Sequence, residues 1–153
     1  MANTYTQLYI QFVFAVQNRA SLITENWQTD LYKYMSGIVV QQDHKLCSIN
    51  GIQDHIHILV SMNPKQAPSD LMYHVKRSSS IWINDNRLCL GKFSWQEGFG
   101  AFSYGKSQIS AVARYIENQK QHHMKHTFID EYRAFLKAFG IEFDERYIYK
   151  QID

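Results

Sequence analysis

Two histidines one residue apart are the clearest candidates for metal chemistry in this sequence. His55 and His57 lie in the segment DHIHILV, which has the composition of a strand. Alternate residues of a strand lie on one face, roughly 6.5–7 Å apart, so both imidazoles point to the same side and the apolar residues to the other. Two imidazoles at this spacing can converge on one divalent ion. The motif also fits two polar side chains on a solvated sheet face, because short motifs have many false matches.

A tyrosine and a glutamine four residues apart form the second candidate. Tyr115 and Gln119 occupy one stripe of a predicted helix, beside its apolar face. At the rim of a helix core, a side chain is both held in place and reachable. A tyrosine there can equally be a packing residue with its hydroxyl in water. His122 and His126 continue this stripe and are rival metal ligands.

The basic charge of the chain is concentrated in its middle. The net charge is only +2, but residues 65–126 carry nine basic and four acidic side chains, and both flanks are slightly acidic. An anionic partner would use such a distribution. Lys76 and Arg77 precede three serines there, a combination suited to phosphate contacts. A solvated helix face has the same composition, so both interpretations stay open.

The elements that must position these side chains alternate along the chain. Hydrophobic periodicity predicts strands over residues 8–16, 46–52 and 55–62, and helices from Thr24, after Pro68 with Ser69 as N-cap, over 106–125 and over 130–139. The glycine-punctuated segment 86–105 predicts a short strand or loop. This order is the split β-α-β arrangement. We therefore expect one α+β domain over residues 1–153, with a ferredoxin-like (RRM-like) antiparallel sheet, helices on one face, an open second face and additional C-terminal helices.

Several classes of protein are excluded by what the sequence lacks. It shows no signal-peptide pattern and no apolar run near the ~20 residues that span a bilayer. Cys47 and Cys89 are far apart and have no CxxC context, which favours reduced, buried thiols in a cytoplasmic protein. No glycine-rich phosphate loop is present, so no nucleotide cofactor is expected.

Taken together, these segments resemble a known family. The motifs DHIHILV, WQEGFGAFS and YIENQKQHH follow one another in the order found in single-tyrosine HUH transposases of the insertion-sequence-200/605-like group, to which the REP-associated tyrosine transposases are related. KRSSSIWI and FIDEYRAFLKAFGIEFDERY are also similar to that family. The resemblance covers nearly the whole chain, and three motifs in order are far more specific than any one of them.

The resemblance implies a reaction and the residues that perform it. His55, His57 and Gln119 would bind a divalent metal, Mg²⁺ or Mn²⁺, and Tyr115 would be the nucleophile. The family cleaves and rejoins single-stranded DNA through a 5′-phosphotyrosine, which keeps the phosphodiester energy so that rejoining needs no ATP. It also implies a homodimer and a ferredoxin-like fold, and it allows the tyrosine to act in trans on the partner's site.

The resemblance further implies a DNA partner and leaves alternatives. The substrate would be single-stranded DNA folded into a hairpin near the end of a mobile element, and its phosphate contacts are expected from the basic middle, with these candidates: Lys76, Arg77, Lys106 and Arg114. One alternative is a domesticated or inactive relative that binds hairpin DNA or RNA without cleaving it. Another is a metal-dependent phosphodiesterase that uses water in place of Tyr115 and forms no covalent adduct.

Overall fold

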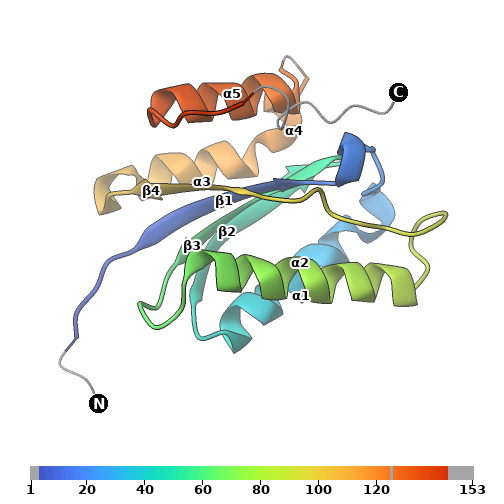
Figure 1. The fold of residues 1–153 in the computed structure, drawn as a ribbon, viewed down its shortest axis with the longest axis horizontal. Coiled ribbons are helices and arrows are strands. Elements are labelled where there is room, and N and C mark those ends of the chain that lie inside the picture. The colour runs from blue at the N-terminus through green and yellow to red at the C-terminus, as the bar shows by residue number, and fades with distance from the viewer. Residues whose placement is uncertain (1–3, 125, 145–153) are drawn as a thin grey trace.

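An antiparallel sheet lies at the centre of the molecule in the computed structural model, which describes residues 4–124 and 126–144 (Figure 1). Its strands stand in the order β2-β3-β1-β4. Their bounds are β1 Tyr9–Ala15, β2 Lys45–Ile52, β3 His55–Ser61 and β4 Gly100–Tyr104. This order, with every neighbouring pair antiparallel, confirms the predicted α+β ferredoxin-like fold.

Two long helices cover one face of the sheet. These are α1 (Glu25–Gln41) and α2 (Pro68–Asp85). Alternate residues of β1 and β3 point toward these two helices and form the hydrophobic core with them. The buried core residues of the two strands include Phe12, Phe14, Ile56, Ile58 and Val60. Helix α2 begins with proline in its first turn, where a missing N–H costs nothing. Its N-cap residue is Ala67 and its first residue is Pro68, so the helix begins two residues earlier than it would with the predicted N-cap Ser69.

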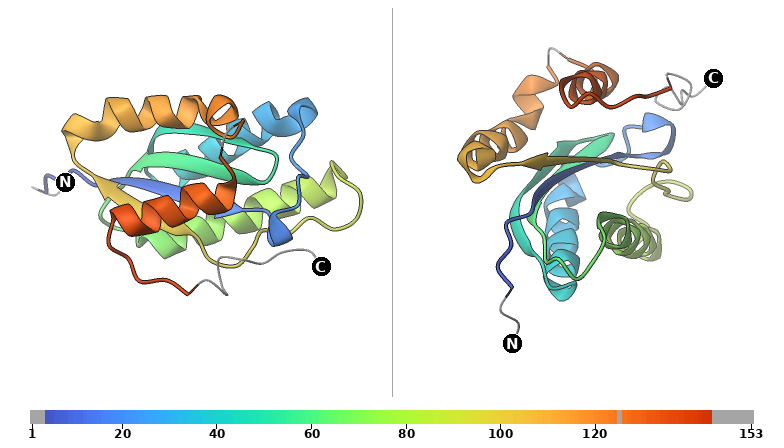
Figure 2. Two further views of the ribbon diagram at one scale, coloured as in Figure 1. Left: turned by 90° about the horizontal axis from the view of Figure 1, so that it is seen from above. Right: turned by 60° about the vertical axis from the view of Figure 1, so that its left-hand side comes forward.

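The second face of the sheet is also covered, contrary to the expectation that it would be open. Helices α3 (Ile109–Glu117), α4 (Gln119–His122) and α5 (Phe128–Ala138) lie over it (Figures 1 and 2). Helix α3 packs Ile116 against Leu59 of β3, and α5 packs apolar side chains against β1 and β4. The C-terminal helices therefore enclose the face that carries His55 and His57.

The C-terminal helices are broken where the sequence predicted continuity. A 3₁₀ turn (Lys106–Gln108) precedes α3, and Asn118 separates α3 from α4 in place of one helix over 106–125. Helix α5 begins two residues earlier than predicted because the Thr127 hydroxyl accepts a hydrogen bond from the backbone N–H of Asp130 at 3.2 Å. The predicted stop at Gly140 is confirmed, since its φ of 66° lies in the left-handed region that favours glycine.

Two further expectations concern membranes and thiols. Within the described residues, no helix has the length and apolarity needed to cross a bilayer. Cys47 and Cys89 carry free thiols, as predicted, but both are half-buried and not enclosed in the core.

Candidate metal centre

Strand β3 places two imidazoles at the centre of the enclosed sheet face. His55 and His57 are both fully buried, and their ring centroids lie 5.2 Å apart. They alternate with Ile56 and Ile58, which belong to the core on the other face. Period-two alternation places both histidines on the same side of the sheet, as the sequence predicted, and the C-terminal helices cover that side (Figure 1).

Helix α4 brings an amide and a third imidazole to the same point. The Oε1 atom of Gln119 lies 3.3 Å from Nε2 of His55 and 3.0 Å from Nε2 of His123. Gln119 and His123 are one helical turn apart, so their side chains share a stripe. The side chain of His123 is only 3% exposed. Gln119, a ligand implied by the family resemblance, therefore lies beside His55, with His123 next to it.

Helix α5 supplies a buried carboxylate that the sequence reasoning missed. Oε1 of Glu131 lies 2.9 Å from Nε2 of His57, 3.3 Å from Nε2 of His55 and 3.2 Å from Nε2 of His123. One ligand atom from each of these four residues falls within 4.8 Å of the others. The available signal was the position of Glu131 three residues after Phe128 and four before Phe135, on the apolar stripe of a helix, where a carboxylate is rarely buried without a partner.

This set of donors fits a divalent ion. Three imidazole nitrogens and a carboxylate oxygen are ligands for borderline and hard divalent cations, and the Gln119 amide oxygen adds a neutral donor. The buried carboxylate of Glu131 also supplies the negative charge that a cation requires. The residues present therefore fit the metal that the sequence motif predicted.

The hydroxyl of Tyr115 lies at the edge of this centre. It donates a hydrogen bond to Oε2 of Glu131, the carboxylate oxygen that faces away from His57. Nε2 of His122 lies 3.4 Å from the same hydroxyl. Tyr115 comes from α3 of the same chain, so one chain brings the hydroxyl and the four-residue donor group together.

The structure distinguishes between the two rival histidines of the sequence pattern. His122 contacts Tyr115 and Oε2 of Glu131, and it is not part of the four-residue donor group. His126 is exposed, and its backbone carbonyl accepts a hydrogen bond from Nδ1 of His123 at 2.7 Å. The interruption of the helix at Asn118 lies between Tyr115 and these histidines, so the simple stripe of an unbroken helix does not apply.

The electrostatics of the centre follow from burial and close pairing. Burial opposes the charged forms of His55 and Glu131, but their hydrogen bonds outweigh it, so the pKa of His55 is raised and the pKa of Glu131 is lowered. Burial lowers the pKa of His57. Burial, together with the nearby charge of His55, lowers the pKa of His123 to about 4. His123 therefore offers a neutral nitrogen at physiological pH.

The candidate DNA contacts are distributed over two sides of the molecule. Lys76 and Arg77 lie on α2, across the sheet from the donor group, whereas Lys106 and Arg114 lie in the segment that covers the other face. The ammonium of Lys76 donates to the backbone carbonyls of Gln96 and Gly98 at 2.7 and 2.8 Å. Lys76 thus supports the loop before β4, while the other three side chains are exposed.

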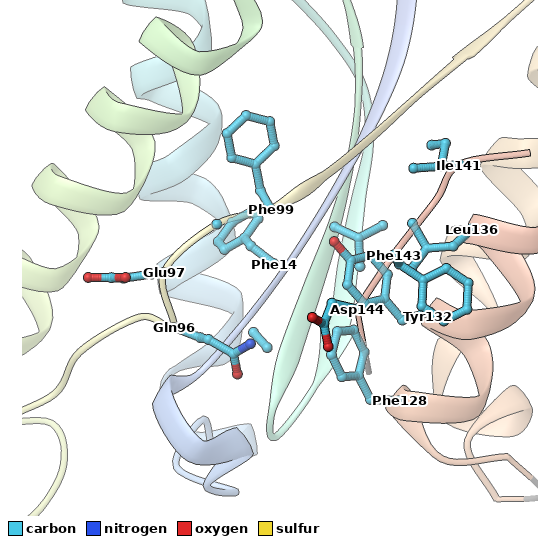
Figure 3. Close-up of a pocket in the computed structure, with 13 residues that line it drawn as sticks. Phe14, Gln96, Glu97, Phe99, Phe128, Tyr132, Leu136, Ile141, Phe143 and Asp144 are labelled. Carbon is cyan, nitrogen blue, oxygen red and sulfur yellow. The ribbon is translucent and has the colours of Figure 1, made fainter. Parts of the chain in front are cut away.

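Two cavities flank the centre. One of about 400 Å³ opens at the nucleophile candidate and is lined mainly by apolar side chains of α5, together with Tyr104, Tyr115 and Glu131. A second, of about 360 Å³, lies between the loop before β4 and α5, where Phe99, Phe128 and Tyr132 line it (Figure 3). Tyr115 and Glu131 thus share the lining of the first cavity.

Comparison with known proteins identifies relatives of this fold. A transposase candidate from Deinococcus radiodurans R1 is 18% identical, with a TM-score of 0.64, over 78% of this chain and 95% of that one. A REP-associated tyrosine transposase bound to a REP hairpin is 15% identical, with a TM-score of 0.60, over 80% of this chain and 73% of that one. At these identities the likeness concerns the fold. No curated protein sequence matches the chain.

A family model gives the assignment. Residues 4–119 match the family described as IS200-like transposases, and this segment is well over half of the 153-residue chain. It contains β1 to β4 and α1 to α3, together with His55, His57, Tyr115 and Gln119. The family resemblance deduced from the motifs is thereby confirmed: the chain belongs to the IS200-like transposase family.

Proposed function

We propose that this transposase cleaves and rejoins single-stranded DNA through a covalent bond to Tyr115, assisted by a divalent ion. The observation that carries the proposal is the carboxylate of Glu131, which contacts the Tyr115 hydroxyl through Oε2 and three imidazoles through Oε1. A nucleophile, a proton acceptor and a set of metal donors thus meet at one buried group.

The metal donors proposed are His55, His57 and Gln119, as the sequence implied, joined by His123 and Glu131. A bound Mg²⁺ or Mn²⁺ would polarise the scissile phosphate and stabilise the charge that develops on its oxygens. The five side chains come from β3, α4 and α5, so the site depends on the docking of the C-terminal helices onto the sheet.

The protein's own residues account for the chemical step. A tyrosine hydroxyl has an ordinary pKa near 10 and is a weak nucleophile, so it needs a base. Glu131, whose pKa is lowered by its bonds from His55 and His57, accepts the phenolic proton through Oε2. The bond from Tyr115 Oη to phosphorus forms, the bond from phosphorus to the 3′-oxygen breaks, and that oxygen takes up a proton. The products are a 5′-phosphotyrosine and a free 3′-hydroxyl, and the reverse reaction rejoins the strand.

The proposed substrate is single-stranded DNA beside a hairpin. Supporting arguments are the family, the basic segment 65–126 and the hairpin bound by the REP-associated relative. The exposed side chains of Arg77, Lys106 and Arg114 are the proposed phosphate contacts. Lys76 has its ammonium committed to two carbonyls, and any contact it makes with DNA would compete with them.

A homodimer in which the tyrosine acts in trans remains a prediction from the family resemblance. Within one chain, Tyr115 already contacts Glu131 and lies 5.8 Å, ring centroid to ring centroid, from His57. Mixing a Tyr115→Phe variant with a His57→Ala variant separates the two arrangements. Restored cleavage means that one chain's tyrosine serves the other chain's metal site.

One experiment tests the proposed function. The purified protein is incubated with Mn²⁺ and single-stranded DNA carrying a hairpin from the flanks of its gene, and the products are run on a denaturing gel. A protein-linked DNA band is expected, and it should disappear in Tyr115→Phe and persist in Tyr132→Phe, a matched loss of a half-buried hydroxyl on α5.

The other outcomes each contradict a part of the proposal. Cleavage that survives Tyr115→Phe would exclude the tyrosine mechanism and support attack by water. Hairpin binding without cleavage or adduct, on DNA that carries the element's own ends, would support the non-cleaving relative. An adduct that forms equally well in the presence of EDTA would exclude the role of the metal.

A further inference from the structure

A line of buried polar groups crosses the sheet and ends at His57. The side chain of Gln11, on β1, is fully buried, although its polarity favours a surface position. Its Nε2 atom lies 2.8 Å from Nδ1 of His57 on β3, and its Oε1 accepts a hydrogen bond of 2.8 Å from the hydroxyl of Tyr104 on β4. Three neighbouring strands thus contribute one residue each to the chain of contacts Tyr104–Gln11–His57.

In the other two imidazoles of the donor group, Nδ1 lies beside an acceptor. A neutral histidine that binds a cation through Nε2 carries its proton on Nδ1, and that proton needs an acceptor. Nδ1 of His55 lies 2.7 Å from the carboxylate of Asp54, and Nδ1 of His123 lies 2.7 Å from the carbonyl of His126. Both partners are acceptors, so Nδ1 of each ring can keep its proton while Nε2 serves as the ligand atom for a cation.

His57 differs because its partner is an amide, which can act either way. With the NH₂ group of Gln11 directed at Nδ1, the ring proton of neutral His57 lies on Nε2 and is donated to Oε1 of Glu131 at 2.9 Å. That proton blocks the lone pair a cation would use. Rotation of the amide by 180° presents Oε1 to Nδ1–H and frees Nε2, and the NH₂ group then donates to the Tyr104 oxygen.

We propose that Gln11 and Tyr104 are positioning residues for the metal site, and that the Gln11 amide reverses when a divalent ion binds to His57. The inference rests on the proposed function only for the presence of the ion. Burial supports the arrangement, since the hydroxyl of Tyr104 has its pKa raised to about 12 and stays protonated, able both to donate and to accept. Gln11 is fully buried and would touch neither the DNA nor the reacting atoms, whereas Tyr104 also lines the cavity that opens at Tyr115.

The test measures metal affinity and the His57 tautomer, not DNA cleavage. Mn²⁺ is titrated calorimetrically into the wild type and the variants Gln11→Leu, Gln11→Glu and Tyr104→Phe. The control is Tyr32→Phe, which removes a largely buried hydroxyl packed against the core on the other face of the sheet. ¹⁵N NMR of the His57 ring is recorded without metal and with Zn²⁺, a diamagnetic probe.

We expect Gln11→Leu to weaken Mn²⁺ binding about 10- to 100-fold, the usual effect of removing a partner of a metal-bound histidine. Gln11→Glu should bind Mn²⁺ at least as tightly as the wild type, because a carboxylate accepts from Nδ1–H in either orientation. Tyr104→Phe should weaken binding less than Gln11→Leu, and Tyr32→Phe should leave it unchanged. The His57 proton should move from Nε2 to Nδ1 when Zn²⁺ binds.

Three results would overturn the inference while leaving the proposed function intact. One is wild-type affinity in Gln11→Leu, and the other is a proton on Nδ1 of His57 both with and without Zn²⁺. Equal losses in the Leu and Glu variants would also overturn it, since they would show a packing role alone. Absence of any Mn²⁺ or Zn²⁺ binding to the wild type would instead contradict the metal centre itself.

Discussion

Replacing His123 by alanine tests the donor group at a residue that the sequence pattern did not include, since the pattern pointed to His122 and His126 instead. The His123 ring is 3% exposed, and its Nε2 lies 3.0 Å from Gln119 Oε1 and 3.2 Å from Glu131 Oε1. Apparent binding free energies of structural zinc sites with four ligands are about 10–16 kcal/mol, or roughly 2.5–4 kcal/mol for each ligand. Since about 1.4 kcal/mol is tenfold in affinity, His123→Ala should weaken Zn²⁺ binding about 60- to 700-fold.

The matched control is His126→Ala, three residues further along. It removes an exposed imidazole but keeps the backbone carbonyl that accepts the hydrogen bond from Nδ1 of His123. Zn²⁺ affinity should therefore stay close to that of the wild type when both proteins are titrated by competition with a chelator of known affinity. A larger loss in His126→Ala than in His123→Ala, or none in either, would refute the assignment of ligands.

Three further predictions follow from other parts of the structure. The first concerns charge: Arg114→Ala should reduce the slope of log binding constant against log salt concentration for DNA by about one. Lys76→Met should leave this slope unchanged and lower the free energy of unfolding by roughly 1–3 kcal/mol, as measured with urea, because its ammonium donates to two backbone carbonyls. A reduced slope in Lys76→Met would show that Lys76 contacts phosphate. The second concerns packing: a Cβ at Gly100 would lie 2.6 Å from Cε1 of Tyr132, which is a steric clash. Gly100→Ala should therefore lower the free energy of unfolding by about 1–3 kcal/mol and Tm by roughly 2–4 °C for each kcal/mol. An unchanged Tm would show that α5 shifts without a loss of stability. The third concerns pH: the pKa of His123 is about 4 in the folded protein against an ordinary 6.5, so on acidification the unfolded chain binds this proton first. The free energy of unfolding therefore falls as the pH drops from above 6.5 toward 4. Metal-free His123→Ala should lose less stability than the wild type between pH 7 and 4.5, and an equal loss would contradict the lowered pKa.

The sequence predicted the sheet, α1 and α2 and the positions of His55 and His57, because strand alternation is a local property with a fixed period. It did not predict the covered second face. The apolar stripes of α3 and α5 show that these helices need a partner but not which surface they cover. Gln11 lies on the face that was expected to be open, and its side chain is fully buried.

The missed members of the centre have a related explanation. Glu131 is far from β3 in sequence and reaches His57 only through the packing of α5. His123 depends on the end of α3 at Glu117 and the start of α4 at Gln119, an interruption that helical periodicity does not reveal. Both residues also lie beyond residue 119, where the match to the family ends.

The late position of Glu131 in the chain has a consequence for how the enzyme is made. The sheet, both imidazoles of β3 and Tyr115 are all synthesised before the carboxylate that joins them. A nascent or truncated chain that ends before α5 thus carries Tyr115 without Glu131 and has only part of the donor group. If the proposed function is correct, DNA cleavage requires that the last described helix has been made and has docked, so an unfinished chain should not cleave its substrate.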